Sequence, residues 1–337
     1  MSLFKARILL YHKSAACQVF LQTFVKIRTI DTRAPPCYNI GMNTKRWLSQ
    51  HTHDLTGVHV AVTGPTGGLG LALCRYLAGL HASLILLDRN AEKSAALQQQ
   101  LLAQFPQLQL RRIPLDLADM ASVRAACAEL KTQPIDILIH NAGAYSIPRT
   151  RCDTGLDNVF QINCAAPYYL TRELLPLLRE RGGHVVMVSS IAHNYAPTDP
   201  ADPDFSTRRP ARLVYGNAKR RLMFALQELF AAETKATLAV AHPGITLTNI
   251  TAHYPKFVFA VIKNPMKWIF MSPQHACLSL LCGVFEKTGY HEWIGPRLFH
   301  IWGAPAHRKL GTCTPAESTA IAAQMDALYQ AMKTPDA

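Results

Sequence analysis

The chain has 337 residues, of which 49% are hydrophobic and 17% charged, and this composition excludes a chain that is disordered throughout. The formal net charge of +13 is uneven, because residues 1–50 contain eight Lys and Arg against the single acid Asp31. The other 287 residues carry only a small positive excess, so a nucleic-acid partner is not expected. Nine cysteines without a Cys-x-x-Cys pair indicate reduced thiols rather than a disulfide framework.

The basic stretch at residues 1–50 is predicted to be a leader outside the fold. Residues 1–30 lack acids and mix Lys and Arg with Leu, Phe and Val, which is the composition of an organelle transit peptide. Met42 offers an alternative start, and residues 1–41 would then be upstream sequence. The first reading predicts an organelle and the second, which we favour, the cytoplasm. No apolar run reaches the roughly 18 residues of a membrane-spanning helix.

From residue 55 the chain alternates short apolar runs with longer helical stretches, of which Ala91–Gln104 and Asp119–Leu130 are examples. Strands separated by helices form parallel βαβ units with helices on both faces. The pattern therefore predicts an α/β fold of the Rossmann type, a doubly wound parallel sheet of about seven strands in one domain over residues 55–305. The strands expected most directly are Val58–Thr63, Ser83–Asp88, Leu108–Ile113, Ile135–Ile139, His184–Ser189 and Thr237–Ala241.

Two segments depart from this alternation. Residues 196–210 contain four prolines, which predict a loop. Residues 306–337 include Thr314-Pro-Ala-Glu317, a capping box with proline at the first helical position. Apolar residues then recur at helical spacing, so an amphipathic C-terminal helix packed on the domain is expected.

A glycine-rich turn, Thr63–Gly70, joins the first expected strand to the first expected helix. Glycines at such a turn let the backbone approach a pyrophosphate, and they let the helix pack closely on the sheet. The N-terminus of the helix offers unpaired N–H groups to the same anion. The turn therefore predicts a dinucleotide-binding site.

Two charged residues after the second expected strand bear on the choice of dinucleotide. Asp88 lies 24 residues after Gly64, where an acid can accept hydrogen bonds from the adenosine ribose and would repel a 2′-phosphate. Arg89 could instead bind that phosphate. NAD(H) is therefore favoured, and NADP(H) stays open.

Tyr215 and Lys219 begin a segment that is expected to be helical to about Ala232. Residues four apart lie on one face of a helix, so both side chains can point into the same cleft. A nearby cation lowers the pKa of a phenol towards that of a general base. The two residues are therefore candidates for an acid–base pair.

The order of these motifs resembles the short-chain dehydrogenase/reductase family over about residues 56–300. That resemblance implies an NAD(P)-dependent oxidoreductase that moves a hydride between a nicotinamide ring and an alcohol or carbonyl group. The matching positions are Thr63, Gly64, Gly68, Leu69 and Gly70 in the turn, Asp116 and Leu117 after the third strand, Asn141, Ala142 and Gly143 after the fourth, Asn163 in a helix, Ser189 and Ser190 after the fifth, Tyr215 and Lys219, and Pro243 and Gly244 after the sixth.

The resemblance also implies a role for each catalytic position. Tyr215 would be the acid–base residue, and Lys219 would lower its pKa and bind the nicotinamide ribose. Ser190 would hydrogen-bond the substrate oxygen, and Asn163 would hold a water that relays the proton to solvent. Asp116 would contact the adenine. The other matching positions would bind the cofactor, and no metal is expected.

Two features point to one branch of the family. Ser190 and Tyr215 are 25 residues apart, and this long spacing, with the sequence Ser190-Ile-Ala-His193, resembles the retinol-dehydrogenase-like branch. That branch handles lipophilic alcohols and aldehydes. In the family, the segment after Gly244 covers the substrate cleft, and residues 255–271 of this chain are apolar and aromatic. This segment could also pack only on the domain or a second subunit, or meet an anionic membrane through its lysines.

Two other functional classes are open to the sequence alone. A non-catalytic dinucleotide-binding module would be marked by loss of Tyr215 or Lys219, and both are present. A sugar-nucleotide epimerase or dehydratase is suggested by the spacing of Gly64, Gly67 and Gly70, which also fits an extended branch of the family. The Asn141–Gly143 motif argues against that branch. A small-molecule substrate is the expected partner, and homo-oligomerisation is left open.

Overall fold

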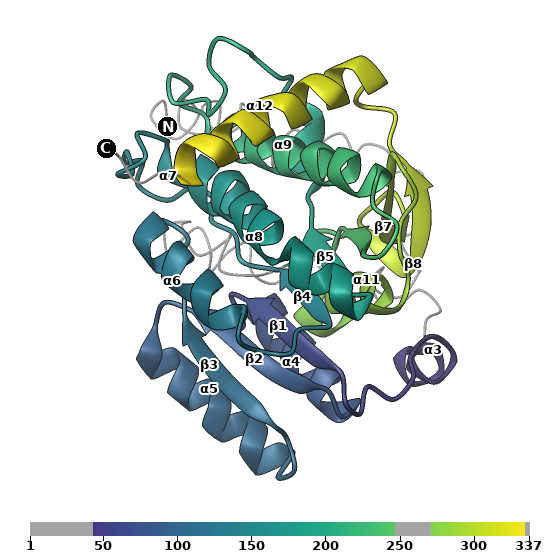
Figure 1. Ribbon diagram of the computed structural model, residues 1–337. Helices are drawn as coiled ribbons and strands as arrows, with labels where there is room; N and C mark the ends of the chain where they lie inside the picture. Colours follow the sequence, from purple (N-terminus) through teal and green to yellow (C-terminus); the bar gives the residue numbers. More distant parts are fainter. Residues whose placement is uncertain (1–42, 247–270, 334–337) are drawn as a thin grey trace, which may run out of the picture.

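The computed structural model describes residues 43–246 and 271–333, and an eight-stranded sheet forms its centre (Figure 1). The strand order is β3-β2-β1-β4-β5-β6-β7-β8. All neighbours are parallel except β7 and β8, which form an antiparallel hairpin. The strands are β1 (His59–Thr63), β2 (Ser83–Asp88), β3 (Leu110–Pro114), β4 (Ile137–His140), β5 (His184–Val188), β6 (Thr237–Ala241), β7 (Glu292–Leu298) and β8 (Trp302–Lys309).

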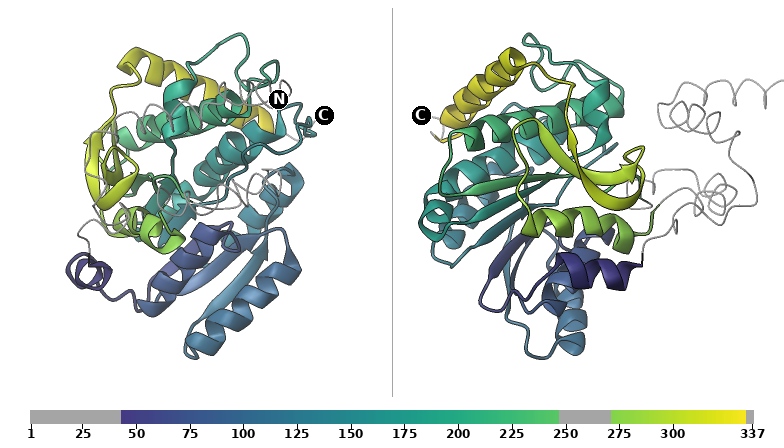
Figure 2. Two further views of the ribbon diagram at one scale, coloured as in Figure 1. Left: turned by 180° about the vertical axis from the view of Figure 1, so that it is seen from behind. Right: turned by 90° about the vertical axis from the view of Figure 1, so that its right-hand side faces the viewer.

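Helices cover both faces of the sheet, as the edge-on view in Figure 2 shows. Side chains alternate along each strand, so Val60 and Val62 of β1 join one core cluster while Ala61 joins the other. One face packs against α3 (Thr44–His51), α4 (Gly68–Gly79), α5 (Ala91–Gln104) and α11 (Pro273–Phe285). The opposite face packs against α6 (Met120–Leu130), α8 (Ala166–Arg181), α9 (Ala211–Ala231) and α12 (Pro315–Lys333).

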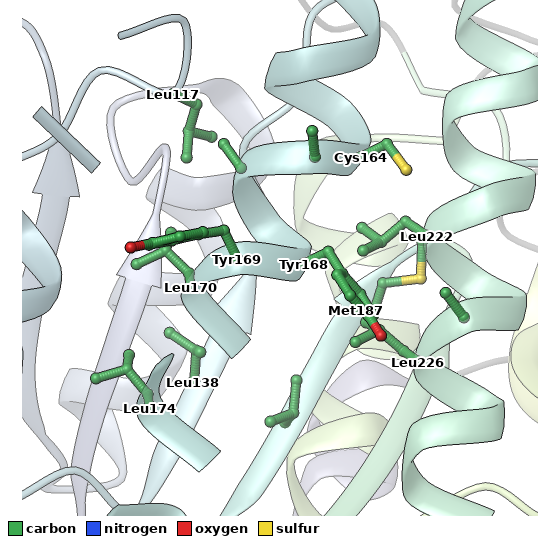
Figure 3. Packing of buried hydrophobic residues seen from close by; sticks show 14 of the residues in the cluster. Leu117, Leu138, Cys164, Tyr168, Tyr169, Leu170, Leu174, Met187, Leu222 and Leu226 are labelled. Carbon is green, nitrogen blue, oxygen red and sulfur yellow. The ribbon is translucent and has the colours of Figure 1, made fainter. Parts of the chain in front are cut away.

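The second of these clusters joins α8 and α9 to the sheet (Figure 3). Leu174 of α8 is buried beside Leu138 of β4, and Tyr168 of α8 and Leu222 of α9 lie beside Met187 of β5. The contact between these two helices and the sheet consists of buried hydrophobic residues. It fixes α9 relative to the ends of β4 and β5, where the predicted site residues lie.

The strand order reverses between β1 and β4, because β2 and β3 extend the sheet one way and β5 to β8 the other. In a doubly wound sheet, the loops that leave such a pair of strands diverge and open a crevice at their carboxyl ends. The Thr63–Gly70 turn follows β1, and Asn141–Gly143 follows β4. The topology therefore brings these two motifs to the crevice.

The predicted fold class is confirmed, with one strand more than expected. The additional antiparallel strand belongs to the β7–β8 hairpin, whose prolines Pro296 and Pro305 pair with each other. Proline is tolerated there because β8 is an edge strand, but it hides the strand pattern in the sequence.

The two ends of the described chain both contact the domain. Residues 43–50 were expected to lie outside the fold, but α3 contacts α11, and its Trp47 is buried in the core cluster to which α11 belongs. The fold therefore begins before residue 55. At the other end α12 lies across α9 and α8 (Figure 1), with Ile321, Met325 and Tyr329 buried in the same cluster.

Candidate active site

The turn after β1 is shaped by two glycines. Gly64 has φ +62°, a left-handed conformation that side chains disfavour, and a Cβ there would lie 2.9 Å from the Cα of Ala142. A Cβ on Gly70 would lie 2.3 Å from the carbonyl oxygen of Gly64 and 2.9 Å from the Cα of Pro65. The first turn of α4 therefore rests directly on the loop backbone, which only glycine allows.

The motif after β4 fastens this turn. The side-chain nitrogen of Asn141 donates to the carbonyls of Thr63 and Gly64 at 3.0 and 2.9 Å. The Ala142 N–H donates to the hydroxyl of Thr63 at 3.0 Å, and that hydroxyl donates to Ile139 at 3.2 Å. The two predicted motifs thus form one rigid unit across the crevice.

The start of α4 faces the same crevice. Gly67 is its N-cap and makes no side-chain capping hydrogen bond. A Cβ on Gly68, the next residue, would make an ordinary contact with Pro273 at 3.9 Å among the described residues, whereas Leu69 packs beside the β7–β8 hairpin. A helix N-terminus of this kind can bind an anion through its backbone N–H groups.

Asp88 ends β2 at the edge of the crevice and is buried. Its Oδ1 accepts from Nε of Arg112 at 3.2 Å, whereas its Oδ2 has no hydrogen-bond partner among the described residues. Arg89 is exposed and lies 3.8 Å from Asp116, next to the buried Leu117. The sequence gives no signal for the role of Arg112, because a β3 side chain reaches Asp88 only through the pairing of β3 with β2.

Tyr215 and Lys219 lie on α9, as predicted, and both face the end of β5. The Lys219 ammonium is buried, donates to the Val188 carbonyl at 2.8 Å and lies 5.7 Å from the centre of the Tyr215 ring. A Cβ on Gly143 would lie 3.6 Å from the same ammonium. The ring of Tyr145 meets that of Tyr215 edge to face, with centroids 5.3 Å apart.

Burial dominates the acid–base properties of this pair. It raises the pKa of Tyr215 to about 12, although the Ser190 hydroxyl, which hydrogen-bonds the phenol, acts in the opposite direction. Burial also lowers the pKa of Lys219 to about 8. The pKa of Tyr215 is thus raised rather than lowered as expected, because desolvation of the phenolate outweighs the hydrogen bond with Ser190, and the neighbouring Tyr145 raises the pKa further.

Of the two neighbouring serines, Ser190 reaches Tyr215. Its hydroxyl also accepts from the Ala192 N–H at 3.2 Å and caps the 3₁₀ turn Ile191–Tyr195, whereas the hydroxyl of Ser189 is buried against Met223. The turn can approach α9 because the residue after Tyr215 is glycine.

A Cβ on Gly216 would lie 2.3 Å from the Ala192 carbonyl oxygen. Gly216 was not among the predicted site residues. A contact with a turn 24 positions earlier leaves no signal in a single sequence.

Asn163 lies in a π-helical turn, Gln161–Ala165, and is fully buried. Its amide nitrogen donates to the carbonyls of Ala144 and Val159, both at 2.8 Å, and its Oδ1 accepts from the Ala144 N–H at 3.1 Å. A Cβ on Gly143 would lie 2.9 Å from the same Oδ1. Asn163 therefore holds the backbone between Asn141 and Tyr145 against Lys219.

The last motif, Pro243-Gly244, lies under the hairpin. Gly244 has φ +80°, and a Cβ there would lie 2.7 Å from the Ile301 carbonyl oxygen and 3.0 Å from Pro296. The following Ile245 packs with Met271. Most of the predicted cover, residues 255–270, lies outside the described residues.

Comparison with known proteins identifies the family. The short chain dehydrogenase family matches residues 58–202. Mouse (Mus musculus) retinol dehydrogenase 14 is 32% identical over 230 residues, which cover 64% of this chain and 69% of that protein. The chain belongs to the short-chain dehydrogenase family. Mouse polyprenol dehydrogenase is 29% identical over 232 residues, covering 65% of this chain and 69% of that protein.

A solved structure agrees with this assignment. An uncharacterised protein of Mycobacterium paratuberculosis superposes with a TM-score of 0.68 at 26% identity, over 85% of this chain and 97% of its own. The predicted family and its retinol-dehydrogenase-like branch are both confirmed. The chain is accordingly an NAD(P)-dependent oxidoreductase. No helix in residues 43–246 or 271–333 has the length and hydrophobicity to span a bilayer.

Proposed function

We propose that the chain interconverts a lipophilic alcohol and its carbonyl compound, with Tyr215 as the proton donor and acceptor. The observation that carries the proposal is the meeting of Ser190, Tyr215 and Lys219 beside the glycine turn. Ser190 hydrogen-bonds Tyr215, and the Lys219 ammonium lies 5.7 Å from the centre of the Tyr215 ring. Gly143, in the motif after β4 that fastens the glycine turn, lies next to the same ammonium. Three groups with complementary proton chemistry thus surround one point at the end of the sheet.

The crevice fits a dinucleotide. Gly64 and Gly70 leave the loop without side chains where a pyrophosphate would approach, and the N-terminus of α4 supplies N–H groups. The unpartnered Oδ2 of Asp88 is a buried acceptor that suits a ribose hydroxyl. When bound, the nicotinamide supplies or accepts the hydride.

The protein residues handle the proton and the substrate oxygen. With a pKa of about 12, the Tyr215 phenol is protonated at neutral pH, the form that gives a proton to a carbonyl oxygen as the alcohol forms. In the reverse direction, the alcohol proton passes to the phenolate, which the Lys219 ammonium favours by its charge. Ser190 holds the substrate oxygen within reach of Tyr215.

Asp88 supports a preference for NAD(H) over NADP(H). Its carboxylate is buried at the end of β2, where it would accept hydrogen bonds from an adenosine ribose and repel a 2′-phosphate. Arg89 is not placed to bind a 2′-phosphate beside Asp88, since its side chain is 71% exposed and lies next to Asp116. Arg112 contacts Asp88 directly, and the carboxylate already accepts a hydrogen bond from it.

Two observations support a lipophilic substrate. The relatives named above act, by their names, on retinol and polyprenol, which are long apolar alcohols. Tyr215 itself is half-buried, meets the ring of Tyr145 and packs against the same apolar cluster as Ile147 and Leu213, so apolar side chains line this part of the site. An apolar chain would gain about 25 cal/mol for each Å² that it buries in such a cleft.

A series of aldehydes of increasing chain length tests the proposal, with NADH and NADPH in parallel and nicotinamide absorbance as the readout. We expect kcat/KM to rise with chain length. Trp268 belongs to the aromatic segment 255–271 that is expected to cover the cleft, so Trp268→Ala should flatten the rise. Leu102→Ala, at an exposed position on α5, is the matched control and keeps the native slope. A preference for short polar substrates would contradict the lipophilic assignment, and no turnover of any substrate would contradict the activity.

A further inference from the structure

A second pocket lies beside the active site and takes no part in the function proposed above. It has a volume of about 310 Å³ and is formed by the segment that follows β4 and by the loop that precedes α9. Four of its seven lining residues are arginines. The lining consists of Arg149, Thr150, Arg151, Asp157, Ser206, Arg208 and Arg209.

The pocket has a fixed frame. The guanidinium of Arg149 is fully engaged, since it pairs with the buried Asp157 and donates to the carbonyls of Phe205 and Arg208 at 3.1 and 3.0 Å. Asp157 in turn caps α7 (Asn158–Phe160) and donates its N–H to Asp204 at 2.9 Å. These contacts tie the two lining segments together.

The charges at the mouth are not balanced. Arg208 is neutralised by Asp199, 2.6 Å away, and by Asp202. Arg209 has no ion pair or hydrogen bond within residues 43–246 and 271–333, and Arg151 donates there only to the Gly155 carbonyl at 2.5 Å. Two guanidinium groups therefore line one pocket with most of their donors unused.

The donors at this mouth match one class of ligand. We propose that the pocket binds a phosphate monoester through Arg151 and Arg209. A carboxylate is satisfied by one guanidinium fork, whereas a phosphate monoester has nearly two negative charges and three terminal oxygens. The hydroxyls of Thr150 and Ser206 line the same pocket and supply further donors. Its volume leaves room for an organic group beyond the phosphate.

The pocket is separated from the catalytic tyrosine by packed side chains. Phe205, Val214 and Val159 belong to a small apolar cluster, and Tyr215 packs against this cluster. Phosphate binding at the arginines therefore does not depend on the proposed catalytic role of Tyr215, and an experiment can contradict either proposal without contradicting the other.

Calorimetric titration of the full chain tests the site, with excess NADH present to fill the glycine turn. The probes are glycerol 3-phosphate, acetate, and vesicles of phosphatidylcholine with and without phosphatidic acid. We expect saturable binding of a phosphate monoester, either as the free molecule or as the lipid headgroup. The two arms distinguish these sources.

Arg151→Gln and Arg209→Gln should each weaken that binding by about tenfold, the effect of losing charge-assisted hydrogen bonds. Arg75→Gln, at an exposed position on α4, is the matched control and should bind as the native chain does. Both variants lie on the surface, so thermal unfolding should stay native and exclude misfolding. Three results would overturn the proposal. They are acetate binding as tightly as the phosphate, unchanged affinity in the double variant with both Arg151→Gln and Arg209→Gln, and no binding of either glycerol 3-phosphate or phosphatidic acid.

Discussion

The two halves of the sheet build their parts of the crevice differently. The half around β1 to β4 is shaped by missing side chains, since Gly64 and Gly70 let backbone rest on backbone. The half around β5 to β8 is instead filled with titratable groups in buried places. Lys219, His193 and His242 all lie there with little exposure.

This difference predicts what each half tolerates. In the β1–β4 half, close backbone contacts leave no room for side chains, so an added methyl group at a glycine should weaken cofactor binding most. In the second half, proton chemistry is limiting, so changes of protonation or alignment should harm stability and turnover most.

The largest effect concerns acid stability. Burial lowers the pKa of His193 to about 4 and that of His242 to about 3, from an ordinary value of 6.5. The unfolded chain therefore binds protons that the folded chain excludes, and stability is complete above pH 6.5 and falls as the pH drops below it. At pH 5 each histidine should reduce the free energy of unfolding by about 2 kcal/mol.

Urea unfolding at pH 5 and pH 7 measures this loss. His242→Asn should remove part of the pH dependence. The exposed His81, whose φ of 66° asparagine tolerates well, gives the control variant His81→Asn, which should retain it. Equal stability at the two pH values would show that the buried histidines do not control acid unfolding.

Gly216→Ala tests alignment in the catalytic half. The new Cβ would collide with the Ala192 carbonyl, so the 3₁₀ turn must move and carry Ser190 away from Tyr215. A displacement of about 1 Å at a reacting centre can cost roughly 100-fold in rate. We expect kcat to fall by about that factor while the affinity for NADH stays native. Native turnover would show that Ser190 is not aligned through this contact.

Gly70→Ala tests shape in the other half. Its Cβ would overlap the backbone of Gly64 and Pro65, and overpacking of this kind costs about 2 kcal/mol. The affinity for NADH should fall by about 30-fold, as measured by fluorescence titration. Gly79→Ala is the control in the same helix, because its Cβ would make only ordinary contact with Phe105 at 3.6 Å. Equal NADH affinities of the two variants would contradict the claim that backbone contacts shape the cofactor site in this half.

Asp88→Ser is expected to have the smallest effect. It removes the acceptor for the ribose and leaves Arg112 without its carboxylate partner. The affinity for NADH should fall by about tenfold, and that for NADPH should rise, because the guanidinium would then meet a 2′-phosphate unopposed. If the native chain already binds NADPH more tightly, the role given to Asp88 is wrong.

The sequence predicted those parts of the molecule whose signal is local. Strands such as Ser83–Asp88 were placed to the residue, because apolar runs and turn residues mark them. The pairing of Tyr215 with Lys219 followed from helical spacing. The features that were missed depend on contacts between distant segments. Gly216 matters only because the 3₁₀ turn rests on it, and Arg112 only because β3 pairs with β2.

The central claim is that Tyr215 transfers the proton while the glycine half holds the dinucleotide, and Tyr215→Phe tests it most directly. Turnover of the best aldehyde and the dissociation constant for NADH should be measured on the same preparation. The account predicts that kcat falls by about 10²–10⁴-fold, the usual contribution of a general acid, with the dissociation constant unchanged. A variant that keeps more than about a tenth of native turnover would contradict the assignment.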